Sequence, residues 1–244
     1  MPLSTDIKAV LLDLDGTLVD TSVAEAAARG AVVGRIATLR EGLDAQEIDG
    51  VYQSIAVTTW TRVFSGSPPK SWDGRPVVEN IIGSVMDRFG VRRDDDPAEL
   101  TDLFMGVLRQ HYRLYPDAGE ALKWLRGRYP LAVVSNGPSD EQRHKLRALG
   151  IEETMDAVLI SEEVGAGKPE PRIFEVALEE LSVSAGEAVH VGDSVKSDVG
   201  GAKAAGLAAV WVNRYGVCRE PQGPVPDAMI LSLAELAGLL GEML

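Results

Sequence analysis

Short apolar runs alternate with helical segments through the second half of the chain, and this rhythm limits the fold more than any other feature. Each run has the length of a buried strand and is bounded by turn residues. Parallel strands need crossover connections, which helices usually supply. The alternation therefore predicts an α/β fold with a doubly wound parallel sheet that helices cover on both faces. The expected strands are 8–12, 131–134, 157–160, 188–191, 208–212 and a short one at 229–231.

A long helical stretch separates the first expected strand from the second. From Val23 to about residue 105 no convincing strand interrupts the pattern, and glycine and proline clusters only punctuate it. A crossover between strands is rarely so long, so we interpret residues 20–105 as an inserted α-helical cap subdomain. Residues 1–19 and 106–244 then form the Rossmann-like core. The helices expected within this core include 118–129, 139–149, 169–181 and 194–205.

Charge and composition narrow the possible partners of the chain. Its 244 residues carry a formal net charge of −13, which argues against nucleic acid and anionic membrane surfaces as main partners. A site for an anionic ligand must therefore supply its own positive charge. No apolar run is long enough to cross a bilayer, and residues 1–8 lack a secretory signal pattern, so we expect a cytoplasmic protein. The single cysteine, Cys218, excludes an internal disulfide.

Two carboxylates follow the first expected strand. Asp13 and Asp15 lie two residues apart, so strand geometry places them on the same side of the chain, and Gly16 permits a sharp turn. Neighbouring carboxylates at a buried strand end repel each other and are costly to desolvate, which favours a cation between them. Mg2+ is the natural candidate because it binds through one or two carboxylates and retains water. The alternative is that both acids are solvated turn residues.

Three further polar segments fall where the expected topology brings them to one crevice, beyond the carboxyl ends of the strands. Ser135-Asn136-Gly137 can form an oxyanion clamp, and Lys168 can provide a fixed positive charge. Asp193 can bind a metal, with Asp198 close by. Each segment taken singly also fits a turn, a surface lysine or acids at the start of a helix.

The order and spacing of these segments closely resemble the four motifs of the haloacid-dehalogenase-like superfamily. The helical insert between the first and second motifs is similar to the cap of that family. The resemblance covers the whole core and implies a hydrolase of the phosphatase branch. The matching segments are Asp13-Leu-Asp15-Gly-Thr17, Ser135-Asn136-Gly137, Lys168-Pro-Glu-Pro and Gly192-Asp193-Ser194 through Asp198.

The resemblance also implies catalytic roles for three residues. Asp13 would be the nucleophile that attacks phosphorus and forms an aspartyl-phosphate. Asp15 would protonate the leaving oxygen and later activate water. Lys168 would orient Asp13 and neutralise charge on the phosphoryl group.

Further roles implied by the resemblance concern the phosphoryl group and the metal. Ser135, together with the amides around Asn136 and Gly137, would hold the phosphoryl oxygens, and Lys168 would help to bind them. Asp13, Asp193 and the backbone carbonyl of Asp15 would bind Mg2+. The residues expected to contact these groups and help to hold them in position are Thr17, Ser194 and Asp198.

The implied activity is Mg2+-dependent hydrolysis of a small phosphorylated metabolite. The dehalogenating branch of the family lacks an acid at the position of Asp15. The branch that cleaves carbon–phosphorus bonds uses a cap lysine, and nothing marks Lys70, the only lysine of the insert, as that residue. Two alternatives stay open, namely a phosphosugar mutase that uses the same aspartyl-phosphate and a non-catalytic phospho-ligand binder on the same fold.

Substrate selection is expected to depend on polar and aromatic residues of the cap, which would open and close over the crevice. A solvated or packing role is the competing interpretation for each of them. Neither the substrate nor the oligomeric state can be read from the pattern. The candidates are Arg35, Arg40, Trp60, Arg62, Lys70, Trp72 and Arg75.

Overall fold

The structure is a computed structural model of the whole chain and describes residues 6–64, 74–91, 97–217 and 223–241. The chain divides into two compact units. Unit 1 comprises Met1–Asp20 and Arg113–Leu244, and unit 2 comprises Thr21–Tyr112. The division expected after residue 105 falls inside helix α4 (Pro97–Gln110). Val107 and Leu108 of this helix pack against the core of unit 2, so the whole of α4 belongs to that unit.

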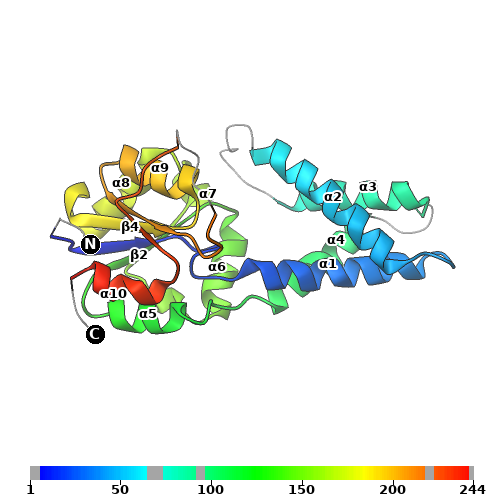
Figure 1. Cartoon of the computed structure of the whole chain (residues 1–244), viewed down its shortest axis with the longest axis horizontal. Coiled ribbons are helices and arrows are strands. Elements are labelled where there is room, and N and C mark those ends of the chain that lie inside the picture. The colour runs from blue at the N-terminus through cyan, green and yellow to red at the C-terminus, as the bar shows by residue number, and fades with distance from the viewer. Residues whose placement is uncertain (1–5, 65–73, 92–96, 218–222, 242–244) are drawn as a thin grey trace. The chain divides into compact units, whose positions relative to one another are not determined.

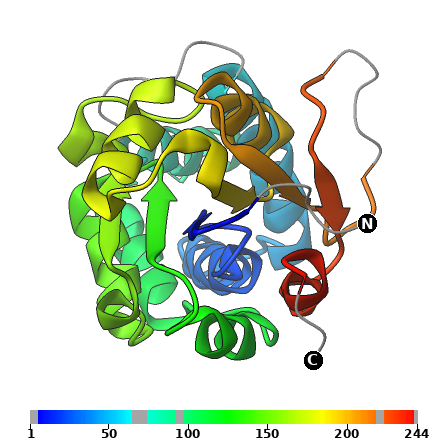
Figure 2. The same ribbon diagram turned by 90° about the vertical axis from the view of Figure 1, so that its left-hand side faces the viewer.

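Unit 1 is built around a six-stranded parallel sheet with the strand order β3-β2-β1-β4-β5-β6. This confirms the predicted doubly wound α/β fold. Figure 2 shows β1 in the middle of the sheet, between β2 and β4. The strands are β1 (Ala9–Leu12), β2 (Leu131–Ser135), β3 (Ala157–Ile160), β4 (Ala188–Gly192), β5 (Ala208–Val212) and β6 (Ala228–Ile230).

Helices cover both faces of this sheet, with α8 and α9 on one face and α5 and α10 on the other (Figure 1). Every residue of β1 is therefore buried, as its continuous apolar sequence requires. Leu11 of β1 belongs to the same apolar cluster as Ile173 and Phe174 of α8. The helices are α5 (Ala118–Leu125), α6 (Ser139–Ala148), α7 (Ser161–Val164), α8 (Pro171–Leu181), α9 (Gly200–Ala204) and α10 (Leu236–Leu239).

The segment after β4 differs from the single helix expected over residues 194–205. A π-helical turn at Val195–Val199 precedes α9, and it carries the buried residue Asp198. Such wide turns are frequently found at functional sites. Short 3-10 turns lie at Glu152–Thr154, Ala185–Glu187 and Leu233–Glu235.

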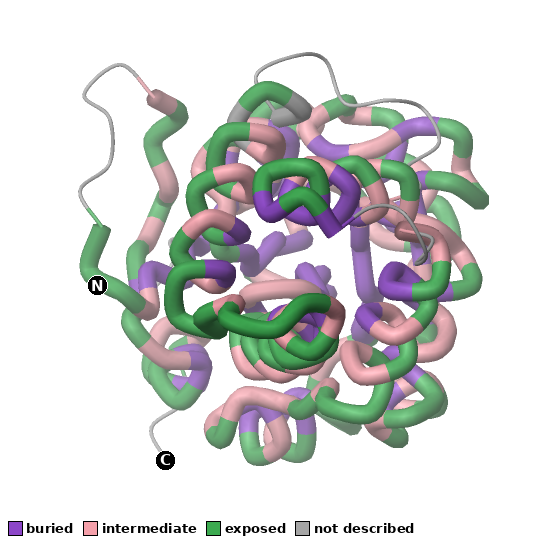
Figure 3. Tube along the Cα trace, turned by 90° about the vertical axis from the view of Figure 1, so that its right-hand side faces the viewer, coloured by how far each residue is buried: buried purple, intermediate pink, exposed green. Residues whose placement is uncertain are grey.

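Unit 2 is a bundle of α1 (Thr21–Thr38), α2 (Ala45–Phe64), α3 (Arg75–Phe89) and α4. Along its helices buried and exposed residues alternate (Figure 3), as expected when one face of each helix packs inward. None of the helices described in either unit is both long and apolar enough to span a membrane.

The cap residues proposed for substrate selection have different environments within unit 2. Trp60 is partly buried against the apolar core, which fits a packing role. Arg75 forms an ion pair with Asp102, with 2.5 Å between Nη2 and Oδ1. Lys70 and Trp72 lie outside the described residues. The remaining candidates, Arg35, Arg40 and Arg62, are exposed.

The two chain segments that join the units are hydrogen-bonded to each other. Val19 forms an antiparallel bridge with Leu114. The N–H of Asp20 donates to the carbonyl of Arg113 over 2.9 Å, and that of Tyr115 donates to Leu18 over 2.9 Å. These bonds fix both segments to the end of unit 1 that carries Asp13.

Arg214, which follows β5, contacts both chain segments close to this junction. Its Nη2 donates to the carbonyl of Thr17 over 2.8 Å, and its guanidinium lies 3.8 Å from the centre of the Tyr115 ring. Its Nη1 donates to Asp117 Oδ2 over 2.9 Å, and the same oxygen accepts hydrogen bonds from Ser232. Although burial opposes ionisation of Asp117, these donors hold the pKa of its carboxyl group below the usual range.

We expect Asp117→Asn to lower the free energy of unfolding at pH 7 by about 1–3 kcal/mol, because the buried guanidinium loses its charged partner. The pKa of Asp117 is lower in the folded than in the unfolded state. Its contribution is therefore present above about pH 4 and is lost as the pH falls through the folded-state pKa. Urea unfolding of both proteins at several pH values should show their difference shrinking in acid.

The matched control for this prediction is Glu120→Gln, which removes a carboxylate from an exposed ion pair with Lys123. Surface ion pairs contribute at most about 1 kcal/mol to stability, so the free energy of unfolding of this variant should stay close to that of the native protein. A difference between native protein and Asp117→Asn that is constant from pH 3 to pH 7 would contradict the role given to the Asp117 charge.

Candidate active site

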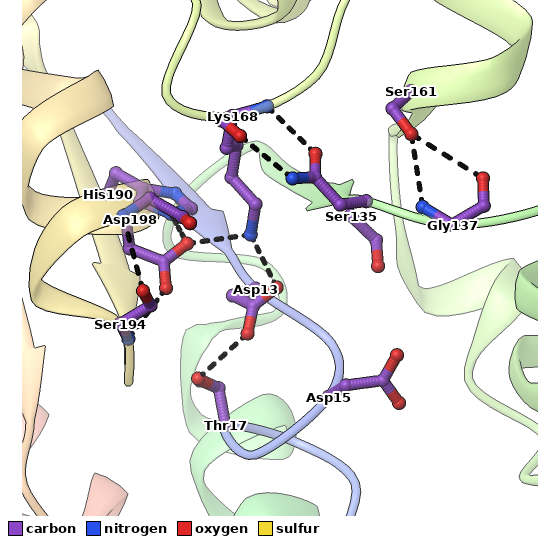
Figure 4. A network of polar contacts seen from close by, with 12 residues as sticks. Asp13, Asp15, Thr17, Ser135, Gly137, Ser161, Lys168, His190, Ser194 and Asp198 are labelled. Atoms are coloured by element: carbon purple, nitrogen blue, oxygen red, sulfur yellow. Dashed lines mark hydrogen bonds and ion pairs between the residues drawn. The ribbon is translucent and has the colours of Figure 1, made fainter. Parts of the chain in front are cut away.

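The polar residues expected from the sequence gather where β1, β2 and β4 end (Figure 4). Asp13 extends the line of β1, and its N–H donates to the carbonyl of Val191 in β4 over 2.9 Å. Lys168 lies in the loop before α8, and Asp198 lies in the π turn before α9. All three charged side chains are buried, so three distant segments of the chain meet in one place.

Lys168 lies between two of these carboxylates. Its Nζ donates to Asp13 Oδ1 over 2.5 Å and to Asp198 Oδ1 over 2.6 Å. Burial works against the charged ammonium, but the two carboxylates raise the pKa of Lys168 above its usual value. Lys168 therefore carries its positive charge at neutral pH.

His190 in β4 also contacts Asp198, at the same carboxylate oxygen that accepts from Lys168. Its Nε2 lies 2.9 Å from Asp198 Oδ1, and its ring meets the Phe174 ring edge-on with centroids 5.0 Å apart. Burial lowers the pKa of His190, so the ring is neutral at pH 7 and donates Nε2–H to the carboxylate. Although burial disfavours its charge, Lys168 and His190 hold the pKa of Asp198 below the usual range.

Three carboxylates crowd this site. One oxygen each of Asp13, Asp193 and Asp198 lie within 4.8 Å of one another. Burial raises the pKa of Asp13 well above its usual value, and Asp198 and Asp193 raise it further against the opposing effect of Lys168. Protein atoms packed around Asp193, and the charges of Asp198 and Asp15, raise the pKa of Asp193 to about 6, although this residue keeps an exposed face.

The donor set of this cluster fits a hard divalent cation, which would relieve the repulsion among the acids. Asp198 already accepts hydrogen bonds from Lys168, His190 and the N–H of Ser194. Asp198 accepts from three donors, whereas each oxygen of Asp13 accepts from one and Asp193 keeps an exposed face, so Asp13 and Asp193 are better placed to face a cation. Asp198 and Ser194 would then support the metal ligands without binding the cation themselves.

Two glycines allow the acids to approach so closely. Gly16 has a φ of +81°, and a Cβ at this position would lie 2.3 Å from Asp193 Oδ2. A Cβ at Gly192 would lie 2.2 Å from Asp198 Cγ. Either side chain would displace a carboxylate of the cluster, so both positions require glycine.

The segment after β2 is engaged in contacts within the protein. Asn136 Nδ2 donates to the carbonyl of Lys168 and its Oδ1 accepts from the N–H of Lys168, both over 2.8 Å. The Asn136 side chain therefore ties down the lysine loop. The N–H of Gly137 donates to Ser161 Oγ over 3.0 Å. Ser135 Oγ accepts from Gln142 Nε2 over 2.5 Å.

Asp15 is held separately from the Lys168 cluster. Figure 4 shows its carboxylate turned away from Lys168, whereas Thr17 Oγ1 donates to Asp13 Oδ2 over 3.2 Å. The partners of Asp15 are Gln142 and Lys145 of α6. Nothing in the motifs marks these two residues or His190. The available signal was helical spacing, since positions 142, 145 and 146 share one face, on which Leu146 is buried.

Known proteins resemble this chain over almost its whole length. Residues 7–206 match the haloacid dehalogenase-like hydrolase family. A phosphoserine phosphatase of Thermus thermophilus is 34% identical over 94% of this chain and 98% of its own length. A glyceraldehyde 3-phosphate phosphatase of Methanopyrus kandleri is 33% identical over 97% of this chain and 98% of its own length. The crystal structure of a HAD phosphatase from Thermococcus onnurineus, 32% identical, aligns with a TM-score of 0.65 over 98% of this chain and 100% of that chain.

The charge balance of the cluster predicts very different losses of stability for two substitutions. Lys168→Met leaves two buried carboxylates without their cation and should lower the free energy of unfolding by about 3–5 kcal/mol. Asp13→Asn removes one of the mutually repelling acids and should change it by less than about 1 kcal/mol. Urea denaturation in the presence of a chelator measures both values.

Lys123→Met is the control for the loss of a lysine, because Lys123 lies exposed on α5. It should leave stability within about 0.5 kcal/mol of the native value. Equal losses for Lys168→Met and Asp13→Asn would show that repulsion among the acids does not govern this cluster.

Proposed function

This chain belongs to the haloacid dehalogenase-like hydrolase family, and on that premise we propose that it is a Mg2+-dependent phosphatase of small phosphorylated metabolites. The observation that carries the proposal is the Asp13–Lys168–Asp198 cluster, with a second acid, Asp15, two residues after Asp13. The names of the two phosphatase relatives support it. Because their named substrates differ at nearly equal identity, the proposal is made for the class of phosphate monoesters rather than for one metabolite.

Asp13 is the nucleophile in this proposal. Lys168 and Thr17 each hold one of its carboxylate oxygens, so the group is fixed at the end of β1. One oxygen forms a bond to phosphorus while the bond from phosphorus to the leaving oxygen breaks, which gives an aspartyl-phosphate and the free alcohol. The ammonium of Lys168 stabilises the negative charge on the phosphoryl oxygens.

Asp15 is the acid and base of the same reaction. In the first step it donates a proton to the leaving oxygen, so that the alcohol departs neutral. In the second step it takes a proton from a water molecule that attacks phosphorus, and this releases inorganic phosphate and restores the Asp13 carboxylate. A carboxyl group at this position therefore favours phosphate ester cleavage over carbon–halogen cleavage.

Asp13 and Asp193 would hold Mg2+, with the backbone carbonyl of Asp15 as the further ligand implied by the family. When bound, the ion supplies positive charge to the phosphoryl oxygens and to the acids around it. The Ser194 N–H donates to Asp198 Oδ2, and this hydrogen bond would help to hold the neighbouring metal ligand Asp193 in position. Unit 2 would act as the cap that selects the substrate.

The first test is phosphate release from a panel of phosphorylated metabolites with Mg2+ that includes phosphoserine, glyceraldehyde 3-phosphate and sugar phosphates. Native protein should release phosphate from some members. Asp13→Asn should lower the rate by more than about 1,000-fold, because it lacks the nucleophile. Comparable turnover by this variant would remove Asp13 from the reaction. Formation of a sugar phosphate isomer without phosphate release would indicate a mutase, and inactive native protein would indicate a non-catalytic binder.

Removal of the metal should stop the same reaction. After thorough chelation we expect phosphate release to fall by at least about 100-fold, because a bound cation contributes several kcal/mol to phosphoryl transfer. Added Mg2+ should restore the rate, and the unfolding temperature should rise with Mg2+ because the ion relieves repulsion between Asp13 and Asp193. Full activity after chelation would contradict the metal site.

A further inference from the structure

We propose that Lys145 is a positioning residue that holds the Asp15 carboxylate where acid–base chemistry requires it, which rests on the role of Asp15 in the proposed function. Lys145 Nζ donates to Asp15 Oδ1 over 2.7 Å and to Asp15 Oδ2 over 2.8 Å. Gln142 Nε2 donates to Asp15 Oδ2 over 2.9 Å. Two side chains of α6 therefore hydrogen-bond to the Asp15 carboxylate, and both of its oxygens are held.

The environment of Lys145 is unusual for a lysine. It is only 7% exposed, and Gln142 beside it is 1% exposed. Lysine is rarely buried, because removing its ammonium from water is costly unless a partner compensates for the loss. Apolar residues often serve stability equally well at such positions, so stability alone gives no reason for this lysine. The hydrogen bonds from Lys145 to Asp15 do give a reason for a lysine at this position.

Gln142 connects the acid to the segment expected to hold the phosphoryl group. Its Nε2 donates to Ser135 Oγ over 2.5 Å and to the Asn136 carbonyl over 3.1 Å, as well as to Asp15. Its Oε1 accepts from Lys145 Nζ over 2.8 Å. Helix α6 thus sets the position of Asp15 relative to the end of β2.

The direction in which Asp15 is held suits its proposed step. In phosphoryl transfer the attacking and leaving oxygens lie roughly in line on opposite sides of phosphorus. The acid must therefore lie one phosphoryl group away from the nucleophile rather than beside it. The Asp15 carboxylate is turned away from Asp13 and Lys168 (Figure 4). The two hydrogen bonds from Lys145 hold it there.

Lys145→Met tests this role through the leaving group. An alkyl phosphate needs a proton on its leaving oxygen, whereas p-nitrophenyl phosphate has a leaving group that departs without one. The value of kcat/KM reports the steps up to departure of the leaving group. We expect the variant to lower kcat/KM by about 100-fold for the best alkyl phosphate of the panel, the loss typical of a misplaced catalytic group. The value for p-nitrophenyl phosphate should fall less than about threefold.

A double variant separates positioning from a general structural effect. If Lys145 acts through Asp15, Lys145→Met should cause no further loss in a protein that already carries Asp15→Asn. Lys123→Met serves as the control for removing a lysine and should leave both substrates unaffected. Lys145→Gln provides a polar second variant in case Lys145→Met does not fold.

Equal losses on the two substrates, or a full additional loss in the double variant, would overturn the role of Lys145 while leaving the phosphatase intact. Native protein that releases phosphate from neither substrate would instead overturn the proposed function, and the inference would fall with it. The two failures are therefore distinguishable in one experiment.

Discussion

The ammonium of Lys168, held between the buried carboxylates of Asp13 and Asp198, is the interaction on which the arrangement of the site depends. Asp13 continues a central strand, Lys168 comes from a loop before α8, and Asp198 comes from a turn before α9. Each charge would be costly to bury alone. Together they form a compact network, because the parallel sheet brings the ends of its central strands side by side.

Two buried lysines each place positive charge beside one of the proposed catalytic acids. The protein carries a net charge of −13, yet the proposed reaction places a doubly charged anion among several acids. Lys168 donates a hydrogen bond to the proposed nucleophile Asp13, and Lys145 donates to the proposed acid and base Asp15. A bound cation would serve Asp13 and Asp193. Positive charge is thus placed close to each acid that takes part in the proposed reaction.

The network reaches the junction between the units through the turn after β1. Thr17 donates to Asp13, and its carbonyl accepts from Arg214, which also contacts Asp117 and Tyr115. The two segments that join the units are therefore anchored to the residues that hold the proposed nucleophile.

The sequence by itself determined the strands and the parallel sheet, because apolar periodicity is a local property of the chain. Its resemblance to the family motifs singled out Asp13, Lys168, Asp193 and their neighbours as candidates. Only the tertiary structure decided which groups hold these residues in place. Asp15 and Lys145 lie 130 positions apart, and Lys168 and Asp198 lie 30 apart. No local pattern links such pairs, because their contact depends on how strands and helices pack. For the same reason, the assignment of the whole of α4 to unit 2 followed from packing and not from composition.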